Sequence, residues 1–366
     1  RHNTIYNCPR AGINVCDGTW GGHLIEGNDV FNTVNETGDH GAFNSWGRDR
    51  YWPLRGKNAL ALLKETPNMP KWDACKTTVI RNNRFRCDYG WDIDLDDGSS
   101  NYHIYNNLCL SGGIKLREGF YRKVENNIML HNSMHPHNWY AECGDIFRAN
   151  ILSGEYKPIR TQKPWGLQCD FNLIHKKKSL SPATILHRQS GRDKHSMIGD
   201  ALFNNAKAGD FSVAANSPAL KLGFKNFPMN KFGVLKKSLR QIAKKPLFTA
   251  AEDSHTVSKS RRIKWHGMLV KMMSGPAEMS ATGMGEERGL FIIQANSKSA
   301  AGVLNLREGD VILSINDEPV STLLGFKKSF EAFTAGTQVK AEVWRFQRLH
   351  NIHISVPPRV AGIKKK

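Results

Sequence analysis

The chain has 366 residues, of which 40% are hydrophobic and 23% are charged, and its formal net charge is +19. A chain of this length has room for more than one domain, and its composition supports a sizeable core and excludes wholesale disorder. No run of about 18 apolar residues occurs, so no transmembrane helix is expected. The excess of cations favours a polyanionic partner, namely nucleic acid, an acidic membrane surface or an acidic polysaccharide, over a merely solvated basic surface.

The cysteines and the first residues give two further expectations. Seven cysteines are spread singly before residue 170, and none forms a Cys-x-x-Cys pair. We therefore expect mostly small buried hydrophobic residues, with at most one or two disulfides, rather than a zinc site. Residues 3–15 already follow the repeat described next, so an N-terminally truncated domain is expected. No signal peptide is visible, and this is uninformative about location.

A short pattern recurs along the first half of the chain: an apolar residue, a polar residue and then an asparagine. The marker asparagines are Asn83, Asn107, Asn127, Asn150 and Asn172, at intervals of 24, 20, 23 and 22 residues. Such a period, with β-type alternation, predicts a parallel β-helix in which each repeat forms one coil and its asparagine stacks at a corner. A leucine-rich repeat would need a leucine framework that is missing, and chance spacing in an antiparallel sandwich is the remaining alternative.

The same pattern divides the chain. We expect a β-helix over residues 1–235 with a closing segment near 210–224, a basic linker or cap at 236–261, a second domain at 262–358 and a basic tail at 359–366. Asn28 and Asn83 are 55 residues apart, which is more than two coils. A long loop inside a repeat array is usually functional or disordered, and this one is rich in Trp, His, Asp and Arg.

Residues 262–358 have the pattern of a small α+β domain. Arg288–Gln294 predicts a glycine loop that enters a strand. The following segment predicts a short helix, a turn at Glu308–Asp310, a buried strand and a turn at Asn316–Asp317. A helix over residues 322–333 and a strand over residues 338–346 complete the expected domain.

The run Leu306-Arg-Glu-Gly-Asp-Val-Ile-Leu-Ser-Ile-Asn-Asp-Glu-Pro-Val320, with the glycine loop before it, resembles the PDZ domain of bacterial high-temperature-requirement serine proteases. The resemblance implies capture of a peptide carboxyl terminus or an extended segment by strand addition. It implies that backbone amides of Gly289, Leu290 and Phe291 hold the carboxylate, and that Lys327 and Phe330 face the groove. An intramolecular spacer without a free ligand is the alternative.

The sharpest candidate for chemistry is the run Gly90-Trp-Asp-Ile-Asp-Leu-Asp-Asp-Gly98. Strand alternation places one apolar and one acidic set on opposite faces: Trp91, Ile93 and Leu95 against Asp92, Asp94 and Asp96. We expect the apolar set to point into the coil and the carboxylates to line the outer face. Because like charges repel, this ladder indicates a functional site or a calcium site. A turn made by Asp96 and Asp97 is the alternative for those two residues.

Lys115 and Arg117 follow one coil later, between Ile114 and Leu116, which we expect to face inward. On the outer face the two cations would form a polar groove with the aspartates, or else a structural salt-bridge ladder between coils. The long loop adds polar residues that could hang over this groove: Asp39, His40, Arg48 and Asp49. Its aromatic residues Trp46, Tyr51 and Trp52 would either stack on a sugar ring or pack the loop onto the coil.

Glycoside hydrolysis requires two carboxyl groups, about 5.5 Å apart for retention or about 6.5–9.5 Å apart for inversion. One carboxylate from the loop and one from Asp92 or Asp94 would meet this need. His131, His135, His137 and Glu142 lie two coils beyond the aspartates. Pro136 argues against a helix there and so against a metal site. Lining of the groove is the other role open to these four residues, and His131 is the one that we assign to it.

Residues 1–235 as a whole resemble secreted bacterial right-handed parallel β-helix proteins of the pectate-lyase-like kind, close to glycoside hydrolase family 141. The runs that carry the resemblance are Gly21–Asn32, Glu36–Trp52, Gly90–Leu110 and Gly113–Asn127. It implies a mostly β chain, a secreted or periplasmic location, and polysaccharide hydrolysis by two aspartates. The acid and base would be Asp39 or Asp49 from one block and Asp92 or Asp94 from another. Substrate contacts are expected from His40, Trp46, Arg48, Asp97, Lys115, Arg117 and His131.

No cofactor is expected except calcium at the face of Asp92, Asp94 and Asp96. Two other functions stay open. A polysaccharide lyase would use Lys115 or Arg117 to remove the proton α to a uronate carboxylate. A non-catalytic surface protein would bind polysaccharide through the β-helix and dock a partner through the PDZ domain. The net charge favours an acidic polysaccharide, whereas the dispersed cations and the lack of a known motif argue against nucleic acid.

Overall fold

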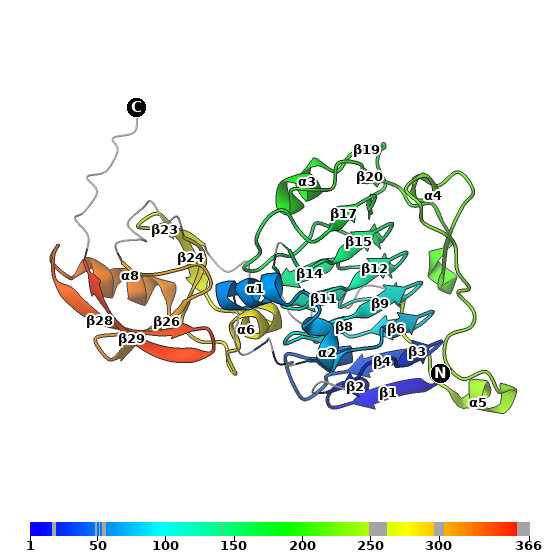
Figure 1. The fold of residues 1–366 in the computed structure, drawn as a ribbon, viewed down its shortest axis with the longest axis horizontal. Helices are drawn as coiled ribbons and strands as arrows, with labels where there is room; N and C mark the ends of the chain where they lie inside the picture. Colours follow the sequence, from blue (N-terminus) through cyan, green and yellow to red (C-terminus); the bar gives the residue numbers. More distant parts are fainter. Residues whose placement is uncertain are drawn as a thin grey trace. The chain divides into compact units, whose positions relative to one another are not determined.

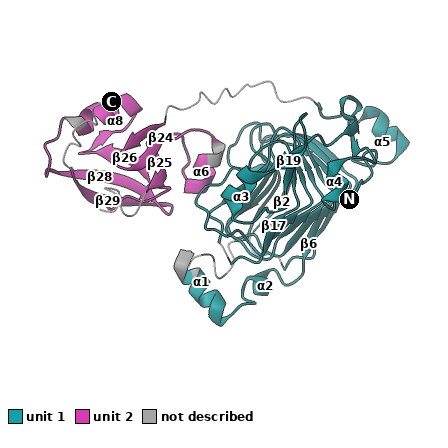
Figure 2. Cartoon of the chain, turned by 90° about the horizontal axis from the view of Figure 1, so that it is seen from above, with its two compact units in different colours: residues 1–252 teal, residues 253–366 magenta. Residues whose placement is uncertain are grey.

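The computed structural model describes the chain except residues 17–19, 48–49, 51, 53–55, 141, 249–261, 296–303 and 357–366. The chain divides into two compact units, residues 1–252 and residues 253–366 (Figure 2). Within the described residues, no helix is both long enough and apolar enough to cross a membrane.

Unit 1 is a parallel β-helix, as the repeat predicts, and its coils stack along one axis (Figure 1). Each full coil contributes one strand to each of three sheets. The first sheet contains β1 (Thr4–Cys8), β4 (Asp29–Thr33), β7 (Arg84–Arg86), β10 (Leu108–Cys109), β13 (Ile128–Met129), β16 (Ile151–Leu152), β18 (Leu173–His175) and β20 (Met197–Gly199), with β19 (Ser181–Pro182) added antiparallel. The second contains β2 (Ile13–Val15), β5 (Gly41–Trp46), β8 (Trp91–Asp96), β11 (Ile114–Arg117) and β14 (Met134–His137). The third contains β3 (Leu24–Glu26), β6 (Thr78–Arg81), β9 (Tyr102–Tyr105), β12 (Lys123–Glu125), β15 (Ile146–Arg148) and β17 (Gln168–Asp170).

The marker asparagines form a continuous buried ladder, which confirms the predicted corner. Asn83 donates its side-chain amide to Asn107 Oδ1 at 2.9 Å, and Asn107 donates in the same way to Asn127 Oδ1 at 3.0 Å. The ladder runs from Asn3 to Asn172, whose backbone N–H donates to Ser196 Oγ. The left-handed backbone falls one residue earlier than the sequence pattern suggested, at Gly27, Asn82, Asn106, Asn126, Ala149 and Phe171.

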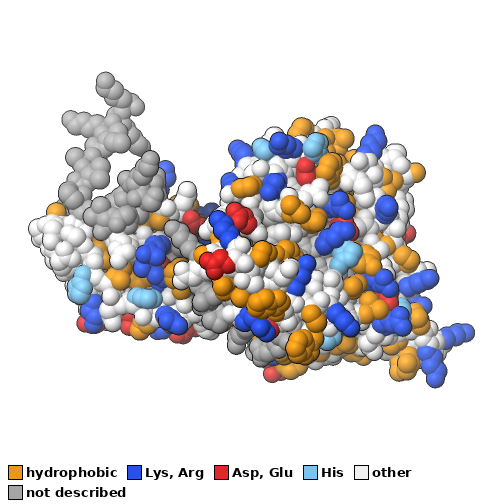
Figure 3. Space-filling view, in the orientation of Figure 1, with side chains coloured by type: hydrophobic (Ala, Val, Ile, Leu, Met, Phe, Trp, Pro, Cys, Tyr) orange, Lys and Arg blue, Asp and Glu red, His pale blue; other side chains and the backbone are white. Residues whose placement is uncertain are grey.

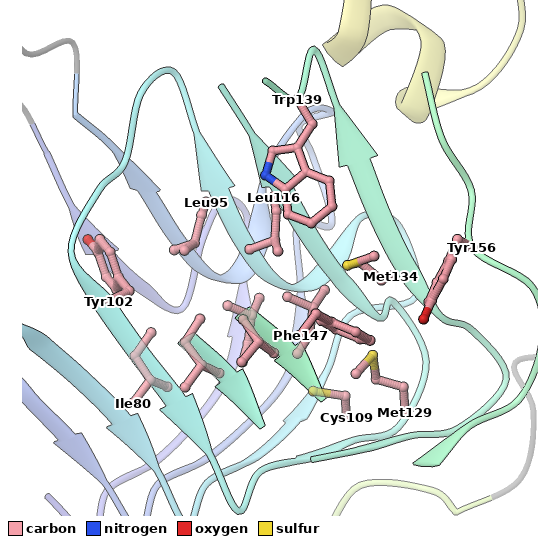
Figure 4. Packing of buried hydrophobic residues seen from close by; sticks show 14 of the residues in the cluster. Ile80, Leu95, Tyr102, Cys109, Leu116, Met129, Met134, Trp139, Phe147 and Tyr156 are labelled. Carbon is pink, nitrogen blue, oxygen red and sulfur yellow. The ribbon is translucent and has the colours of Figure 1, made fainter. Parts of the chain in front are cut away.

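The interior of the coils is filled by stacked apolar side chains from all three sheets (Figure 4). Ile93 and Leu95 of β8, and Ile114 and Leu116 of β11, belong to this core and are fully buried, as predicted. All seven cysteines are free thiols, and four of them, Cys87, Cys109, Cys143 and Cys169, are buried. Most of the cysteines therefore act as small hydrophobic residues in the coil.

The remaining elements of unit 1 lie outside the coils. Helices α1 (Gly56–Glu65) and α2 (Pro70–Asp73) occupy the long connection between β5 and β6, and α3 (Thr184–Ser190) follows β19. The hairpin β21 (Phe203–Asn205) and β22 (Asp210–Val213), with η2 (Ala206–Ala208) between them, leads to α4 (Pro218–Lys221) and α5 (Lys237–Ile242). Phe211, Phe224 and Phe227 pack against Leu108 and Ile128, so this closing segment covers the outer side of the first sheet.

Unit 2 is an antiparallel sheet with two described helices. The sheet order is β23 (Ile263–Trp265), β24 (Met268–Met272), β25 (Leu290–Ala295), β26 (Val311–Ile315), β28 (Gln338–Arg345) and β29 (Arg348–Ser355), with β27 (Glu318–Pro319) paired to β26. The helices are α6 (Pro276–Thr282) and α8 (Leu323–Glu331).

The predicted strands of this unit and the helix near residues 322–333 are present. Asn316 and Asp317 both have positive φ, as a tight hairpin turn requires, and Thr322 caps α8. The short helix predicted after residue 299 falls mostly outside the described residues.

Candidate functional site

The outer face of the second sheet carries two rows of polar side chains. One row runs through Asn44, Asp94, Lys115 and His135, which are paired in register across β5, β8, β11 and β14. The neighbouring row pairs Trp46 with Asp96, and Arg117 with His137. The residues between these rows point into the coil core, so the rows face outward.

Lys115 lies at the centre of a buried charge cluster. Its Nζ is 2.9 Å from Asp94 Oδ1, 3.4 Å from Asp96 Oδ1 and 3.4 Å from Asp39 Oδ1. The same ammonium is 4.1 Å from the centre of the Trp91 ring, a cation–π contact. The side chain of Lys115 has no exposed surface. We call Asp39, Asp94, Asp96 and Lys115 the Lys115 cluster.

Arg117 extends the cluster along the second row. Its Nε lies 3.4 Å from Asp96 Oδ1, 3.5 Å from Asp97 Oδ1 and 3.0 Å from Glu118 Oε1. Asp96 therefore contacts both cations and links them. This arrangement contains the salt-bridge ladder that the sequence left as an alternative, since the cations pair with acids of the preceding coil.

The pKa values of the two neighbouring aspartates move in opposite directions. Burial raises the pKa of Asp94 well above its ordinary value, and the attraction of Lys115 does not offset this. For Asp96, burial also favours the neutral form, but Lys115 and Arg117 outweigh it and hold the pKa below its ordinary value. Burial would lower the pKa of Lys115, yet Asp94, Asp96 and Asp39 raise it. Of the two neighbouring aspartates, the fully buried Asp94 therefore holds a proton more readily than Asp96 does.

Asp92 does not belong to this site, and its predicted place in the groove is wrong. Its carboxylate is fully buried and accepts backbone N–H bonds from Cys87 at 2.7 Å, and from Ser111 and Gly113 at 3.0 Å. Asp92 therefore fastens the turn before β8 to the next coil. Burial raises the pKa of its carboxyl to about 7.

Strand alternation fails at the start of β8. The backbone N–H groups of Asp92 and Ile93 both donate to the carbonyl of Gly113, whereas from Ile93 onward the strand pairs with β11 in regular register. Trp91 is not in the coil interior where alternation placed it. Its ring meets Lys115 and the edges of His135 and His137 on the outer face instead.

Asp94 points outward from the coil, as predicted. The aspartates do not line an open groove, however, because the site around Asp94 is buried. Asp94 has no exposed surface, whereas the side chains of Asp39 and Asp96 are 35% and 13% exposed. Asp39 lies in the turn before β5 with a φ of 54°, a conformation that aspartate tolerates better than most residues. Solvent therefore reaches the cluster at Asp39 and Asp96.

The residues that could hold calcium differ from those predicted, because Asp39 takes the place of Asp92. Oxygens of Asp39, Asp94 and Asp96 all lie within 4.8 Å of one another, close enough to hold one ion, whereas Asp92 is committed to backbone groups. Lys115 Nζ contacts the same three carboxylates. An ammonium thus already supplies the positive charge at this point, and a metal ion would have to displace it.

His135 and His137 are site residues that the sequence left as possible groove lining without assigning them to the site. Both rings are buried, and burial lowers the pKa of each well below its ordinary value, so both are neutral. His135 Nε2 is 2.7 Å from Asn132 Oδ1. Among the described residues, neither ring nitrogen of His137 has a hydrogen-bond partner. The coil period could have identified them in the sequence, because His135 follows Lys115 by 20 residues and His137 follows Arg117 by 20 residues.

The other predicted site residues divide into three groups. His40 accepts a hydrogen bond from Arg10 Nε at 2.9 Å and lies near enough to Lys115 and Asp96 to interact electrostatically with both. Burial and the charge of Arg10 lower the pKa of His40. Trp46 lies beside Asp96 in register, and Asp97 contacts Arg117. The predicted role of His131 is not supported, since its neighbours are Ser153, Phe248, Arg86 and Asp88. Arg48 and Asp49 lie outside the described residues.

The peptide-binding prediction for unit 2 conflicts with the strand pairing. Leu290 and Phe291 lie in β25, which pairs with β24 on one side and with β26 on the other. Neither edge is open there for an added strand, although Gly289 has the positive φ expected of the loop. Phe330 is buried with its ring 4.8 Å from that of Trp265, so it serves the core, while Lys327 is exposed.

Comparison with known protein families finds no family that matches this chain, and no curated protein matches it. The argument for function therefore rests on the residues of the Lys115 cluster. The resemblances to glycoside hydrolase family 141 and to PDZ domains remain predictions from the sequence.

Proposed function

We propose that unit 1 is a glycoside hydrolase that cleaves a complex, anionic polysaccharide at the exposed edge of the Lys115 cluster. The observation that carries this proposal is the opposite shift of two aspartates on one strand. Burial raises the pKa of Asp94, whereas Lys115 and Arg117 hold the pKa of Asp96 below its ordinary value, and both carboxyl groups lie within 3.4 Å of the same ammonium. Titratable groups with pKa values pushed apart are what acid–base catalysis at one bond requires.

The roles follow from exposure. Asp96 is ionised and reaches solvent, so it is the carboxylate that attacks the anomeric carbon. Asp39 is the most exposed member, so it passes the proton held by the cluster to the departing glycosidic oxygen, and Asp94 stores that proton. Oxygens within 4.8 Å leave less room than the about 6.5–9.5 Å that inversion needs, so the expected outcome is retention.

An anionic sugar fits the surroundings of this edge. Exposed Arg10 has its guanidinium 5.0 Å from the Trp46 ring centre, and the same side chain bonds His40. An aromatic face beside a guanidinium suits a sugar ring that bears a carboxylate or a sulfate. The chain's net charge of +19 acts in the same direction.

A lyase that uses Lys115 as base is less favoured. A base must be neutral to accept a proton, whereas three carboxylates raise the pKa of Lys115 and enclose its ammonium. The pKa of Arg117 is raised too, by Asp96, Glu118 and Asp97 against the effect of burial. Neither cation is suited to remove a proton near neutral pH.

The test is turnover of sulfated and uronic-acid polysaccharides by the full chain and its variants. We expect new reducing ends, no ultraviolet-absorbing product, and a retained anomer by NMR. Asp96→Asn and Asp39→Asn should each lower kcat by at least about 100-fold, while the control Asp200→Asn, on a partly exposed acid of unit 1, should not. Ultraviolet-absorbing products would establish lysis instead. Binding without turnover would favour the non-catalytic surface protein.

A further inference from the structure

A second surface of unit 1 combines positive charge with exposed apolar side chains. From residue 211 to residue 251 the chain contains no Asp or Glu. It contains eight cations, Lys221, Lys225, Lys231, Lys236, Lys237, Arg240, Lys244 and Lys245. We call residues 231–247, which hold six of them and include α5, the basic segment.

The basic segment is fixed to the first coils at both of its ends. At its start, Gly233 donates its backbone N–H to the Gly27 carbonyl at 2.8 Å, and Val234 donates to Thr4 Oγ1 at 3.2 Å. At its end, Arg86 donates to the Leu247 carbonyl at 2.7 Å. The segment is therefore an ordered part of unit 1, attached to the coils at both of its ends.

Between these ends, large apolar side chains point to solvent. Leu235 is 50% exposed, Leu239 45%, Ile242 76% and Leu247 69%. Leu239 and Ile242 are three residues apart within α5, which places them on one face of this short helix, and Leu235 lies just before the helix begins. The cations among them, Lys236, Lys237, Arg240, Lys244 and Lys245, are exposed as well. In Figure 3, hydrophobic and basic side chains stand together at the lower right, where Figure 1 places α5.

We propose that the basic segment binds the surface of an anionic lipid membrane, with its cations on the headgroups and its leucines and isoleucine in the boundary with the acyl chains. An apolar face flanked by Lys and Arg, without acids, is the composition that such surfaces favour. An acidic polysaccharide would attract the cations but would leave Leu239 and Ile242 in water. A partner protein is the other occupant, and it would not require anionic lipid.

The first experiment measures co-sedimentation of the full chain with lipid vesicles. We expect binding to vesicles of phosphatidylcholine with phosphatidylglycerol, and at least tenfold weaker binding to phosphatidylcholine alone. Binding should fall steeply between low salt and about 0.5 M NaCl, because screening shortens the reach of the charges. Equal binding to both vesicle types, or to neither, would overturn the proposal.

Matched variants separate this surface from general charge. Lys236→Gln/Lys237→Gln/Arg240→Gln removes three cations from the basic segment, and Lys176→Gln/Lys177→Gln/Lys178→Gln removes three exposed cations elsewhere on unit 1. Since each cation near the membrane contributes about a fivefold gain in binding, only the first variant should lose binding by more than tenfold. Equal losses would mean that net charge alone is responsible.

The apolar part has its own control. Leu239→Ser/Ile242→Ser should weaken vesicle binding at least tenfold, whereas Leu324→Ser/Leu349→Ser, on exposed leucines of unit 2, should not. A Leu239→Trp reporter should show blue-shifted fluorescence on anionic vesicles only. All four residues are exposed, so melting temperatures should match that of the unmodified chain. Undiminished binding of the Leu239→Ser/Ile242→Ser variant, or an unshifted reporter, would refute insertion.

Discussion

Replacing Lys115 with methionine tests the electrostatic account of the cluster directly. Methionine keeps most of the side-chain volume but removes the ammonium that contacts Asp39, Asp94 and Asp96. Removing one partner of a buried ion pair costs about 3–5 kcal/mol, because the remaining charge is left without compensation. That is a large fraction of the about 5–15 kcal/mol that keeps a domain folded.

The loss should depend on pH in a defined direction. Without Lys115, burial of Asp94 and Asp96 is opposed by less positive charge, so we expect their folded-state pKa values to lie above the unfolded value of about 4 and the folded state to bind more protons than the unfolded state. The stability of the variant should therefore fall as pH rises from about 4 towards neutral. In the unmodified chain Asp96 acts in the opposite sense, since its lowered pKa contributes stability above the unfolded pKa and loses it only in acid.

Urea unfolding at two pH values measures both effects. We expect Lys115→Met to lose about 3–5 kcal/mol near pH 7.5 and less than half of that near pH 4.5. The control is Lys123→Met, which removes a partly exposed lysine paired with Glu125 and should cost at most about 1 kcal/mol. Calcium should stabilise only the Lys115→Met variant, since the ammonium no longer competes for the carboxylates. A small, pH-independent loss equal to that of Lys123→Met would refute the reasoning.

Three other substitutions have expected outcomes. Asn127→Ala opens the buried ladder and should cost about 2–4 kcal/mol in urea unfolding, while the exposed Asn204→Ala should be near neutral. Asp92→Ala removes three backbone hydrogen bonds and should lower the melting temperature by several degrees; an unchanged melting temperature with lost turnover would return Asp92 to the active site. Phe330→Ala should destabilise unit 2 by about 3–5 kcal/mol, and intact stability would show that its ring is not a core residue.

The repeat could be predicted because it is written once in every coil. The marker asparagines donate to a backbone carbonyl of the preceding coil, and those from Asn83 to Asn150 also donate to the next asparagine, so the same residue type must recur wherever that corner recurs. The direction of Asp94 was also accessible, since Ile93 and Leu95 beside it are unambiguously apolar. The left-handed corner was harder to locate, because Ala149 and Phe171 occupy it as well as Asn and Gly.

The errors share a cause: they depend on where two distant segments meet. Alternation is lost before Ile93 at the point where the backbone N–H groups of Asp92 and Ile93 both donate to one carbonyl, that of Gly113 in the next coil. The charge around Asp94 depends on Asp39, which a distant turn brings to Lys115, and the edge of β25 is occupied because β24 pairs with it. Alternation along a single strand contains none of this information.

Because of the asparagine ladder, the spacing between neighbouring coils does not depend on the number of residues in a coil. Asn28 and Asn83 are 55 residues apart in sequence, yet the Asn28 side chain donates to Asn83 Oδ1 at 2.9 Å, as in coils of 20 to 24 residues. The chain that carries α1 and α2 therefore leaves and rejoins the stack without altering its pitch. Segments between two rungs can be lengthened, shortened or exchanged as cassettes while the sheets stay in register. The turn that presents Asp39 to Lys115 is one such cassette, so the chemistry of this edge can be varied independently of the scaffold.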